Sequence, residues 1–449
     1  MKNLFRTGVI ALLLAEPEVR VVALMKSAER VARYQKEFAH PGLSYEVVPY
    51  GGVFRGRLNT FFEWLKFALL RTETTDLHRL TTMRQTGNVV SYWVGKMVNR
   101  LIARPSVVRL ARALDLLLVR DSAYRPYFDK HAPDLVFLAH LFEEPETHIL
   151  REAKRRGIKT VALVNSWDKV TTRCVMRLLP EKVIVFNESI KAELISHNGV
   201  READIFVSGI PQYDRYFTRA PSSREAFFER IGLDPRAKLV VYAPFGQMFS
   251  ASDWDVIDLL HRLNAEGKFG AGVEILVRFQ PNDKLDRAEV EKRPHLRYDY
   301  PGIRLSSNRF AYSTRSIDWD MDEADLAHLY DTLAHLSLLI AYATSMVVDA
   351  AIFEKPVINI NFDLPSSAQG FSQSPTLYYR KTHYRKALAT GGIRLVGSPD
   401  ELAVWVRRYL ADPTLDREKR QRLVGEQCTF TDGRSAQRLA QAILRCLRD

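Results

Sequence analysis

Short apolar runs alternate with amphipathic stretches over most of the chain. Runs that are rich in β-branched residues and bounded by breakers predict strands at 19–23, 45–49, 135–139, 160–165, 182–186, 205–207, 238–243, 274–279, 336–342 and 357–360. Apolar positions at helical spacing predict helices at 4–14, 145–156, 189–197, 224–231, 253–266, 346–353, 398–411 and 434–448, and a long helical region at about 57–130. Strands of this kind, alternating with helices, are typical of a parallel sheet that is covered on both faces.

The alternation of strands and helices stops after residue 214 and restarts at residue 224, beyond a linker that contains Pro221. At 449 residues the chain is too long for one ordinary core. We therefore expect an α/β fold of two similar-sized lobes. The N-terminal lobe spans 1–215 and carries the helical region 57–130 as an insertion, and the C-terminal lobe spans 224–430.

Positive charge is concentrated at the N-terminal end. The net charge is +12, and residues 1–120 hold 19 Lys/Arg against 9 Asp/Glu, which is +10. Between residues 57 and 112 the cations are interleaved with Phe, Trp, Leu and Met. A cationic, aromatic-rich helical region can dock on an anionic membrane surface or bind nucleic acid, and we expect nucleic acid least. The alternative is a helical layer over the sheet with a solvated basic face.

The apolar stretches are too short to span a bilayer. The best candidate, residues 8–15, falls far below the roughly 20 residues that a span needs. Charged residues follow it without a small-residue cleavage site, which is not typical of a signal peptide. The three cysteines are scattered, so we expect a reducing cytoplasm and no zinc site. We therefore expect the protein to be cytoplasmic. The basic region suggests, as an alternative, that it binds peripherally to the inner face of the cell membrane.

The segment 325–362 predicts a helix, a buried strand, a turn, a short helix and a second buried strand. Thr344 and Ser345 form the turn, at the carboxyl end of a strand and the beginning of a helix. In open α/β sheets ligands bind at this edge, and a helix N-terminus favours an anion such as phosphate. The alternative is ordinary helix capping by the two hydroxyls. Asp349, one turn further on, either binds a ribose hydroxyl or is a buried carboxylate with protein partners.

Several short motifs, in their order and spacing, resemble bacterial GT-B-fold glycosyltransferases that build surface polysaccharides, a group that includes the CDP-glycerol glycerophosphotransferases. The motifs are SWD at 166–168, VIVFNE at 183–188, GIPQYD at 209–214, APFG at 243–246, RFQP at 278–281, ATS at 343–345, DAA at 349–351 and PVI at 356–358. The resemblance covers about residues 130–365. It implies two Rossmann-like lobes that face a cleft. It also implies a nucleotide-sugar or CDP-polyol donor on the C-terminal lobe and a glycan or lipid-linked acceptor on the N-terminal lobe. The final helix, within 431–449, would cross back onto the N-terminal lobe.

The donor side of such a cleft has further candidates. Arg278 ends a predicted strand, and a guanidinium group there suits bidentate phosphate binding, although a salt bridge at the strand end is the alternative. Phe245 and Gly246 follow another strand, and the glycine would let backbone approach a phosphate, or simply form a turn. Gln280 stands where many of these relatives have histidine before proline. Glutamine can donate a hydrogen bond to phosphate but brings no charge.

Transfer to a hydroxyl also needs a base. Asp168 follows the strand at 160–165 and is the first candidate, with capping of the next turn as the alternative. His140 follows the strand at 135–139 and is the second candidate, although a histidine there is often structural. The carboxylates at 318, 320 and 322 have the spacing of a Mg²⁺ cluster, but Asp favours helix starts, and we expect no metal and no cofactor beyond the nucleotide-activated donor.

Three functions compete. The first is a GT-B glycosyltransferase or phosphopolyol transferase of cell-surface glycan synthesis. The second is a nucleotide-sugar 2-epimerase of the same fold, although the His-Arg-Arg-Glu-Asn type of motif found in that family is absent from this sequence. The third is a non-catalytic nucleotide- or glycan-binding assembly protein.

Overall fold

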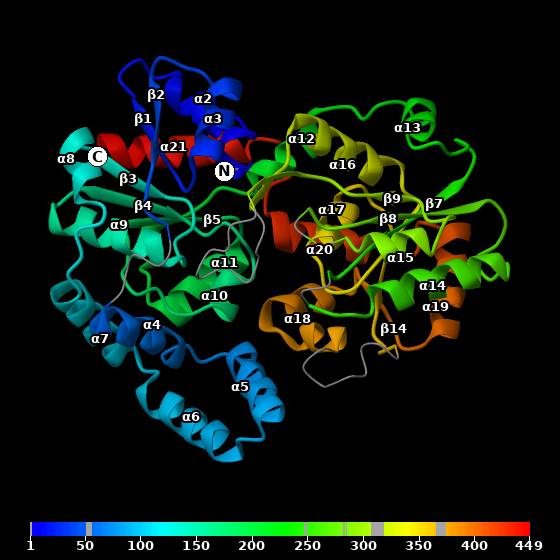
Figure 1. Ribbon diagram of the computed structural model, residues 1–449, viewed down its shortest axis with the longest axis horizontal. Coiled ribbons are helices and arrows are strands. Elements are labelled where there is room, and N and C mark those ends of the chain that lie inside the picture. The colour runs from blue at the N-terminus through cyan, green and yellow to red at the C-terminus, as the bar shows by residue number, and fades with distance from the viewer. Residues whose placement is uncertain are drawn as a thin grey trace.

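The computed structural model describes residues 2–50, 56–246, 249–281, 283, 285–306, 318–364 and 374–449. Two lobes, each built on a parallel sheet, lie side by side (Figure 1). The predicted α/β class with two parallel-sheet lobes is confirmed, and the fold is of the GT-B type.

The N-terminal lobe is built on a four-stranded parallel sheet of order β3-β4-β5-β6. Its strands are β3 (Leu135–Leu138), β4 (Lys159–Leu163), β5 (Lys182–Val185) and β6 (Ile205–Val207), and a separate parallel pair joins β1 (Val21–Met25) and β2 (Leu43–Val47). Helices of this lobe are α1 (Lys2–Phe5), α2 (Val9–Leu14), α3 (Ala28–Glu37), α9 (Glu144–Arg155), α10 (Lys169–Thr172) and α11 (Glu188–Glu193). The helix predicted over 4–14 is divided between α1 and α2, because Gly8 adopts a φ of 80°.

The C-terminal lobe is built on a six-stranded parallel sheet of order β14-β13-β12-β7-β8-β9. Its strands are β7 (Lys238–Ala243), β8 (Val273–Arg278), β9 (Tyr298–Asp299), β12 (Leu338–Ala341), β13 (Val357–Ile360) and β14 (Arg394–Val396). The helices are α13 (Arg224–Arg230), α14 (Asp253–Ala265), α15 (Arg287–Glu291), α16 (Glu323–His335), α17 (Met346–Ile352), α18 (Thr382–Ala389), α19 (Pro399–Ala411) and α20 (Arg417–Cys428). Every residue of β12 and β13 is buried, which explains their uninterrupted apolar sequence.

The helical insertion consists of α4 (Arg57–Ala68), α5 (Glu73–Thr86), α6 (Val89–Ile102), α7 (Pro105–Leu118) and α8 (Arg125–His131). Helices α4 to α7 project from the lower part of the N-terminal lobe (Figure 1). Helix α5 also reaches the other lobe, where the Thr382 N–H on α18 donates to the Thr74 hydroxyl at 2.9 Å. The insertion therefore touches both lobes.

The chain crosses between the lobes twice. The first crossing is the segment that contains α12 (Asp214–Thr218), and the second leads into α21 (Ser435–Arg448), which packs in the core of the N-terminal lobe (Figure 1). The Asp214 carboxylate joins the two crossings, because it accepts hydrogen bonds from the N–H groups of Ser435 at 2.9 Å and Ala436 at 2.7 Å. These N–H groups are otherwise left unsatisfied at the start of a helix.

A third link between the lobes comes from the antiparallel pair β10 (Ile303–Ser306) and β11 (Asp318–Asp320), in a part of the chain where the sequence predicted no strand. Asp320 lies against the N-terminal lobe, where the Arg6 guanidinium and the Tyr34 hydroxyl each donate to its carboxylate at 3.0 Å. Only the long-range fold places these partners together, since more than 280 residues separate Tyr34 from Asp320.

The close packing of α21 near the first crossing requires glycine at position 209. Gly209 has a φ of 81°, and a Cβ added to it would lie 2.5 Å from the hydroxyl oxygen of Ser435 on α21. We expect Gly209→Ala to destabilise the protein by about 2–4 kcal/mol, because it combines a left-handed backbone with a steric clash. Gly199→Ala is the matched control: Gly199 has a φ of 63° but no atom within 4 Å of an added Cβ, so we expect only about 1 kcal/mol. Chemical denaturation measures both, and equal losses would contradict the close packing of α21.

Candidate active site

A cavity of about 490 Å³ lies where the lobes meet, at the carboxyl ends of β7, β8 and β12. The C-terminal lobe contributes Arg278, Gln280, Thr344, Ser345 and Asp349 to its wall. The opposite wall comes from the link between α1 and α2, from α2, from the first crossing with α12, and from the start of α21. Five of the predicted donor-side residues thus line one cavity.

Two arginines in the wall of this cavity carry buried N–H groups that have no hydrogen-bond partner among the described residues. Arg278, at the end of β8, donates from Nη1 to Asp299 at 2.9 Å, while its buried Nη2 has no hydrogen-bond partner among the described residues. Arg215, on α12, donates from Nη2 to Glu323 at 2.6 Å, and its buried Nη1 likewise has none among them. Leaving a buried donor unsatisfied costs about 1–3 kcal/mol, and more for a charged group. The cavity wall therefore favours an anionic ligand.

The burial of Arg278 also affects its ionisation. Burial lowers the pKa of Arg278, and the neighbouring Asp299 carboxylate acts in the opposite direction. The ion pair with Asp299 thus keeps a cation at the carboxyl end of a buried strand. The predicted salt bridge and the predicted phosphate contact are compatible, because each uses a different nitrogen of the same guanidinium group.

The turn before α17 lies in the wall of the same cavity. The Thr344 hydroxyl accepts a hydrogen bond from the Met346 N–H at 3.3 Å, whereas the exposed Ser345 side chain makes no capping bond. Asp349 is buried and accepts hydrogen bonds from the hydroxyls of Tyr213 at 3.2 Å and Tyr216 at 2.8 Å. Asp349 therefore ties α17 to the first crossing.

The loop after β7 is organised by a buried carboxylate. Asp253 accepts hydrogen bonds from the N–H groups of Phe245 at 2.8 Å and Gly246 at 2.7 Å, and burial raises its pKa to about 6. The Gln280 amide donates to the Phe245 carbonyl at 2.7 Å. The Phe245 side chain is buried, with its ring 4.6 Å from that of Tyr378. A phosphate near Gly246 would compete with Asp253 for these N–H groups. Of Phe245, Gly246 and Gln280, only Gln280 lines the cavity, so the structure does not bring Phe245 and Gly246 into the cavity wall together with the other predicted donor-side residues.

Asp168 lies outside this cavity, at the contact between α10 and the C-terminal lobe. It accepts a hydrogen bond from the Ser166 hydroxyl, and the adjacent Trp167 ring lies 5.4 Å from that of His383 on α18. Burial would raise the pKa of Asp168, but the Ser166 hydrogen bond and the nearby charges of His383, Arg173 and Lys169 outweigh it and lower the pKa. Asp168 is therefore an ionised carboxylate facing a helix of the other lobe.

His140 also lies outside the cavity, after β3. Its Nδ1 is 2.9 Å from the side-chain nitrogen of Asn165, and its backbone N–H donates to Glu146 at 2.7 Å. Burial lowers the pKa of His140 well below its usual value. Burial also raises the pKa of Glu146 to about 7, although the hydrogen bond from the His140 N–H and the charge of Lys169 act to lower it. Asp168 and His140 thus sit in different polar clusters of the N-terminal lobe.

The acidic run at 318–322 has protein partners. Asp320 pairs with Arg6, and Asp322 caps α16 through a reciprocal capping box with Asp325. The side chain at 318 lies outside the described residues. Among the side chains that are described, no group of three or more His, Cys, Asp or Glu is arranged to hold a metal ion.

Sequence reasoning missed Arg215, Lys381 at the N-cap of α18, and His383 on α18. Arg215 directly follows the GIPQYD motif, and its position beside that motif was the available signal. Burial lowers the pKa of Lys381 to about 8 and that of His383 to about 4. No pattern along the chain connects Lys381 or His383 with Asp168, which is more than 200 positions away from both.

Comparisons with known proteins agree with this two-lobed architecture. A protein from Listeria monocytogenes described as a UDP-N-acetylglucosamine 2-epimerase has a TM-score of 0.51 at 11% identity, covering 99% of this chain and 93% of that one. A second UDP-N-acetylglucosamine 2-epimerase has a TM-score of 0.51 at 12% identity, covering 99% and 92%. The wall teichoic acid polymerase TagF has a TM-score of 0.40 at 14% identity, covering 76% and 97%. No curated protein sequence matches.

Fold and cavity together define a GT-B-type protein with a cavity between its lobes that is lined by arginines of both the first crossing and the C-terminal lobe. The family model of the CDP-glycerol:poly(glycerophosphate) glycerophosphotransferases matches residues 159–445, and the chain belongs to this family. The resemblance inferred from the sequence motifs is thereby confirmed. The protein is a transferase of the CDP-glycerol type that uses a nucleotide-activated donor.

The raised pKa of Glu146 gives a testable pH dependence. The folded pKa of about 7 lies above the ordinary value of 4.5, so the fold favours the protonated form. The contribution of Glu146 to stability is therefore full below pH 4.5 and is lost as pH rises to 7. We expect Glu146→Gln to gain stability relative to the native protein between pH 5 and pH 8. Urea unfolding at both values measures this, with the exposed Glu225→Gln as control, and a pH-independent difference would contradict the burial of the carboxyl group.

Proposed function

We propose that the protein transfers a glycerophosphate, or a related phosphopolyol or sugar, from a CDP-activated donor to a hydroxyl group of a cell-surface glycan or lipid-linked acceptor. The observation that carries the proposal is the pair of unpaired, buried N–H groups of Arg215 and Arg278 in the wall of the cavity between the lobes. Membership of the family supports the choice of donor. Similarity to the two epimerases reflects the shared fold.

The donor diphosphate would lie against the two guanidinium groups. Transfer of a glycerophosphate forms a bond between the acceptor oxygen and the β-phosphorus and breaks the phosphoanhydride, so that CMP leaves with an additional negative charge. Preorganised cationic donors stabilise such developing charge more than water does. Thr344 and Ser345 add hydroxyls in the same wall. Charge neutralisation is thus assigned to protein side chains, and the scheme uses no metal cofactor.

Asp168 is proposed as the base that accepts the proton of the acceptor hydroxyl. Because Asp168 lies outside the cavity, this role requires the acceptor hydroxyl to be held between Asp168 and the donor phosphate when both substrates are bound. Its lowered pKa keeps it ionised near neutral pH, and it faces α18 across the contact between the lobes. His140 is the weaker candidate, because burial strongly disfavours its protonated form. In this scheme the acceptor lies on the N-terminal lobe and the donor on the C-terminal lobe.

The arginines give the direct test of the donor site. We expect Arg215→Gln and Arg278→Gln each to lower kcat/KM for CMP release from CDP-glycerol by about 10²–10³-fold, as loss of one charge-stabilising donor does in other enzymes. Both should also abolish the thermal stabilisation by CDP. Arg236→Gln is the matched control, because this exposed arginine pairs only locally, with Asp234. Unchanged kinetics in both cavity variants would overturn the donor assignment.

The base is tested separately. We expect Asp168→Asn to lower kcat by about 10²–10⁴-fold while leaving the stabilisation by CDP intact, since a general base contributes to the chemical step and not to donor binding. His140→Asn should retain most of the activity. Measuring kcat and KM for both variants decides between them: loss of kcat in His140→Asn with an active Asp168→Asn would assign the base to His140.

A further inference from the structure

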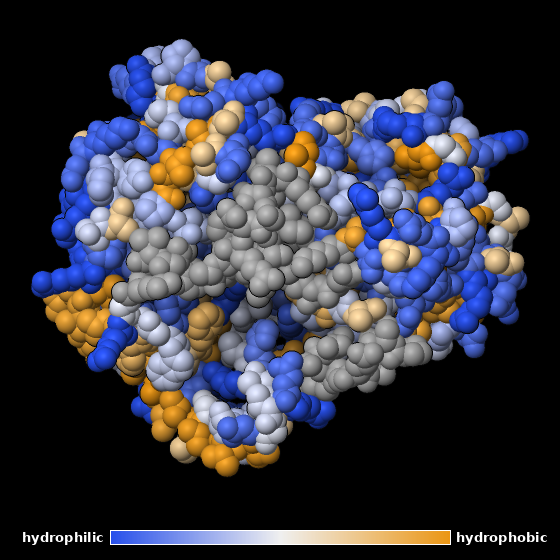
Figure 2. Space-filling model, viewed as in Figure 1, coloured by the Kyte–Doolittle hydropathy of each residue, from blue (hydrophilic) through white to orange (hydrophobic). Residues whose placement is uncertain are grey.

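The helices of the insertion are oriented with apolar side chains toward solvent. On α6 the exposed residues Val90, Trp93 and Met97 recur at helical spacing, and Trp93 is 61% exposed. Similar stripes occur on α4 and α7, where Trp64 is 57% and Leu117 67% exposed. We call these residues together the outer face: Leu58, Phe61, Trp64, Phe67, Val89, Val90, Trp93, Val94, Met97, Leu101, Leu110, Leu114, Leu117 and Leu118. Hydrophobic residues gather at the lower left of the molecule, over the insertion (Figure 2).

Polar side chains occupy the inner side of the same helices. Asn99 on α6 donates to the carbonyls of Ala68 at 2.5 Å and Leu70 at 3.0 Å, and so fixes α6 to the end of α4. Asp115 on α7 is 1% exposed and accepts hydrogen bonds from Arg151 at 2.5 Å and Arg177 at 2.6 Å. Apolar residues such as Phe62 on α4 and Val108 on α7 are also buried on this inner side, so the helices expose a second apolar stripe in addition to the residues that they pack inward.

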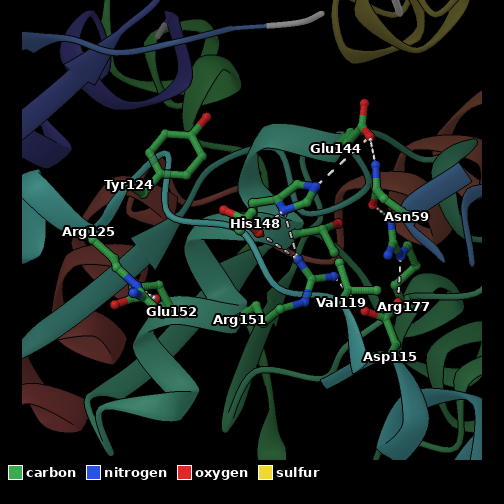
Figure 3. A network of polar contacts seen from close by, with 12 residues as sticks. Asn59, Asp115, Val119, Tyr124, Arg125, Glu144, His148, Arg151, Glu152 and Arg177 are labelled. Atoms are coloured by element: carbon green, nitrogen blue, oxygen red, sulfur yellow. Dashed lines mark hydrogen bonds and ion pairs between the residues drawn. The ribbon is translucent and has the colours of Figure 1, made fainter. Parts of the chain in front are cut away.

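The inner contacts form one buried network that ties the insertion to the lobe (Figure 3). Arg177 donates to Asn59 at 2.7 Å and Glu63 at 2.8 Å on α4, and to Asp115 on α7. The Asn59 amide in turn donates to Glu144 on α9 at 2.5 Å. Removing one partner of a buried ion pair is strongly destabilising, so the network holds α4 and α7 in this orientation. The outer face is thus presented by a fixed framework.

Over α6 and most of α7 the charge around the outer face has one sign. Residues 87–114 hold five Lys/Arg and no Asp or Glu. Arg100, Arg104 and Arg109 are exposed, and the Lys96 ammonium lies 5.7 Å from the Trp93 ring. Arginine and lysine beside tryptophan suit the headgroup region of an anionic bilayer, where apolar residues enter the acyl boundary and cations meet phosphate.

We propose that the outer face is the surface by which this protein docks, without spanning, on an anionic phospholipid bilayer. Among the described helices none is long and apolar enough to cross a membrane. A bilayer is favoured over a second copy of the chain, because symmetric pairing of this face would bring the same cations together. This proposal names the membrane and does not depend on the activity assigned to the cleft.

Vesicle flotation of the full chain tests the proposal. We expect binding to phosphatidylglycerol-containing vesicles and much weaker binding to pure phosphatidylcholine vesicles. The variant Trp64→Ser/Trp93→Ser/Leu117→Ser should reduce the ratio of bound to free protein at least tenfold. Arg100→Gln/Arg104→Gln/Arg109→Gln should lower the preference for anionic vesicles by about fivefold per residue at low salt.

A control variant tests whether vesicle binding depends on the outer face in particular or on any exposed apolar side chain. Val404→Ser/Ile195→Ser changes exposed residues elsewhere and should float like the native protein. Circular dichroism confirms that each variant is folded. The proposal is overturned if the native protein does not float with anionic vesicles. It is also overturned if the outer-face variant floats to the same extent as the native protein. It is equally overturned if light scattering shows a dimer that the outer-face variant dissociates while vesicle binding is retained.

Discussion

The architecture depends on the return of the chain from the C-terminal lobe to the N-terminal lobe, which the Asp214 carboxylate holds through the first N–H groups of α21. Helix α21 then contributes to the core of the N-terminal lobe. Both α12 and the first turn of α21 line the cavity, so one hydrogen-bonded junction sets the distance between the cavity walls. Asp349, bound to Tyr213 and Tyr216, couples the donor-side helix to the same junction.

The insertion contacts both lobes and also presents an apolar surface to solvent. Its inner polar network binds the N-terminal lobe, its helix α5 touches α18 of the C-terminal lobe through Thr74 and Thr382, and its outer face is apolar. Helix α18 also carries His383, which lies beside the proposed base Asp168. A transferase that acts on lipid-linked acceptors would gain from this arrangement, because the proposed acceptor side of the cleft and the proposed docking surface would belong to the same lobe.

The sequence predicted the strands that consist of apolar runs between breakers. Strands β6, β7 and β13 have the predicted bounds, because uninterrupted apolar runs between breakers leave little ambiguity. The sequence analysis did not predict α20 or β14. Helix α20 consists mainly of polar and charged residues and buries few of them, and β14 has only three residues. For such elements packing against the lobe, and not local pattern, decides the structure.

Five donor-side residues could be placed in one cavity from sequence, because the carboxyl ends of parallel strands must lie at the same edge of a sheet. The sequence also determined the two lobes, the family and the concentration of cations in the insertion. Only the tertiary structure showed that the N–H groups of Phe245 and Gly246 donate to Asp253. It also placed Arg215 and Arg278 in the wall of one cavity, and it decided that apolar residues of the insertion face solvent. The reason is physical: strand polarity is a local property of the chain, whereas hydrogen-bond partners and the direction of an amphipathic face depend on residues hundreds of positions apart.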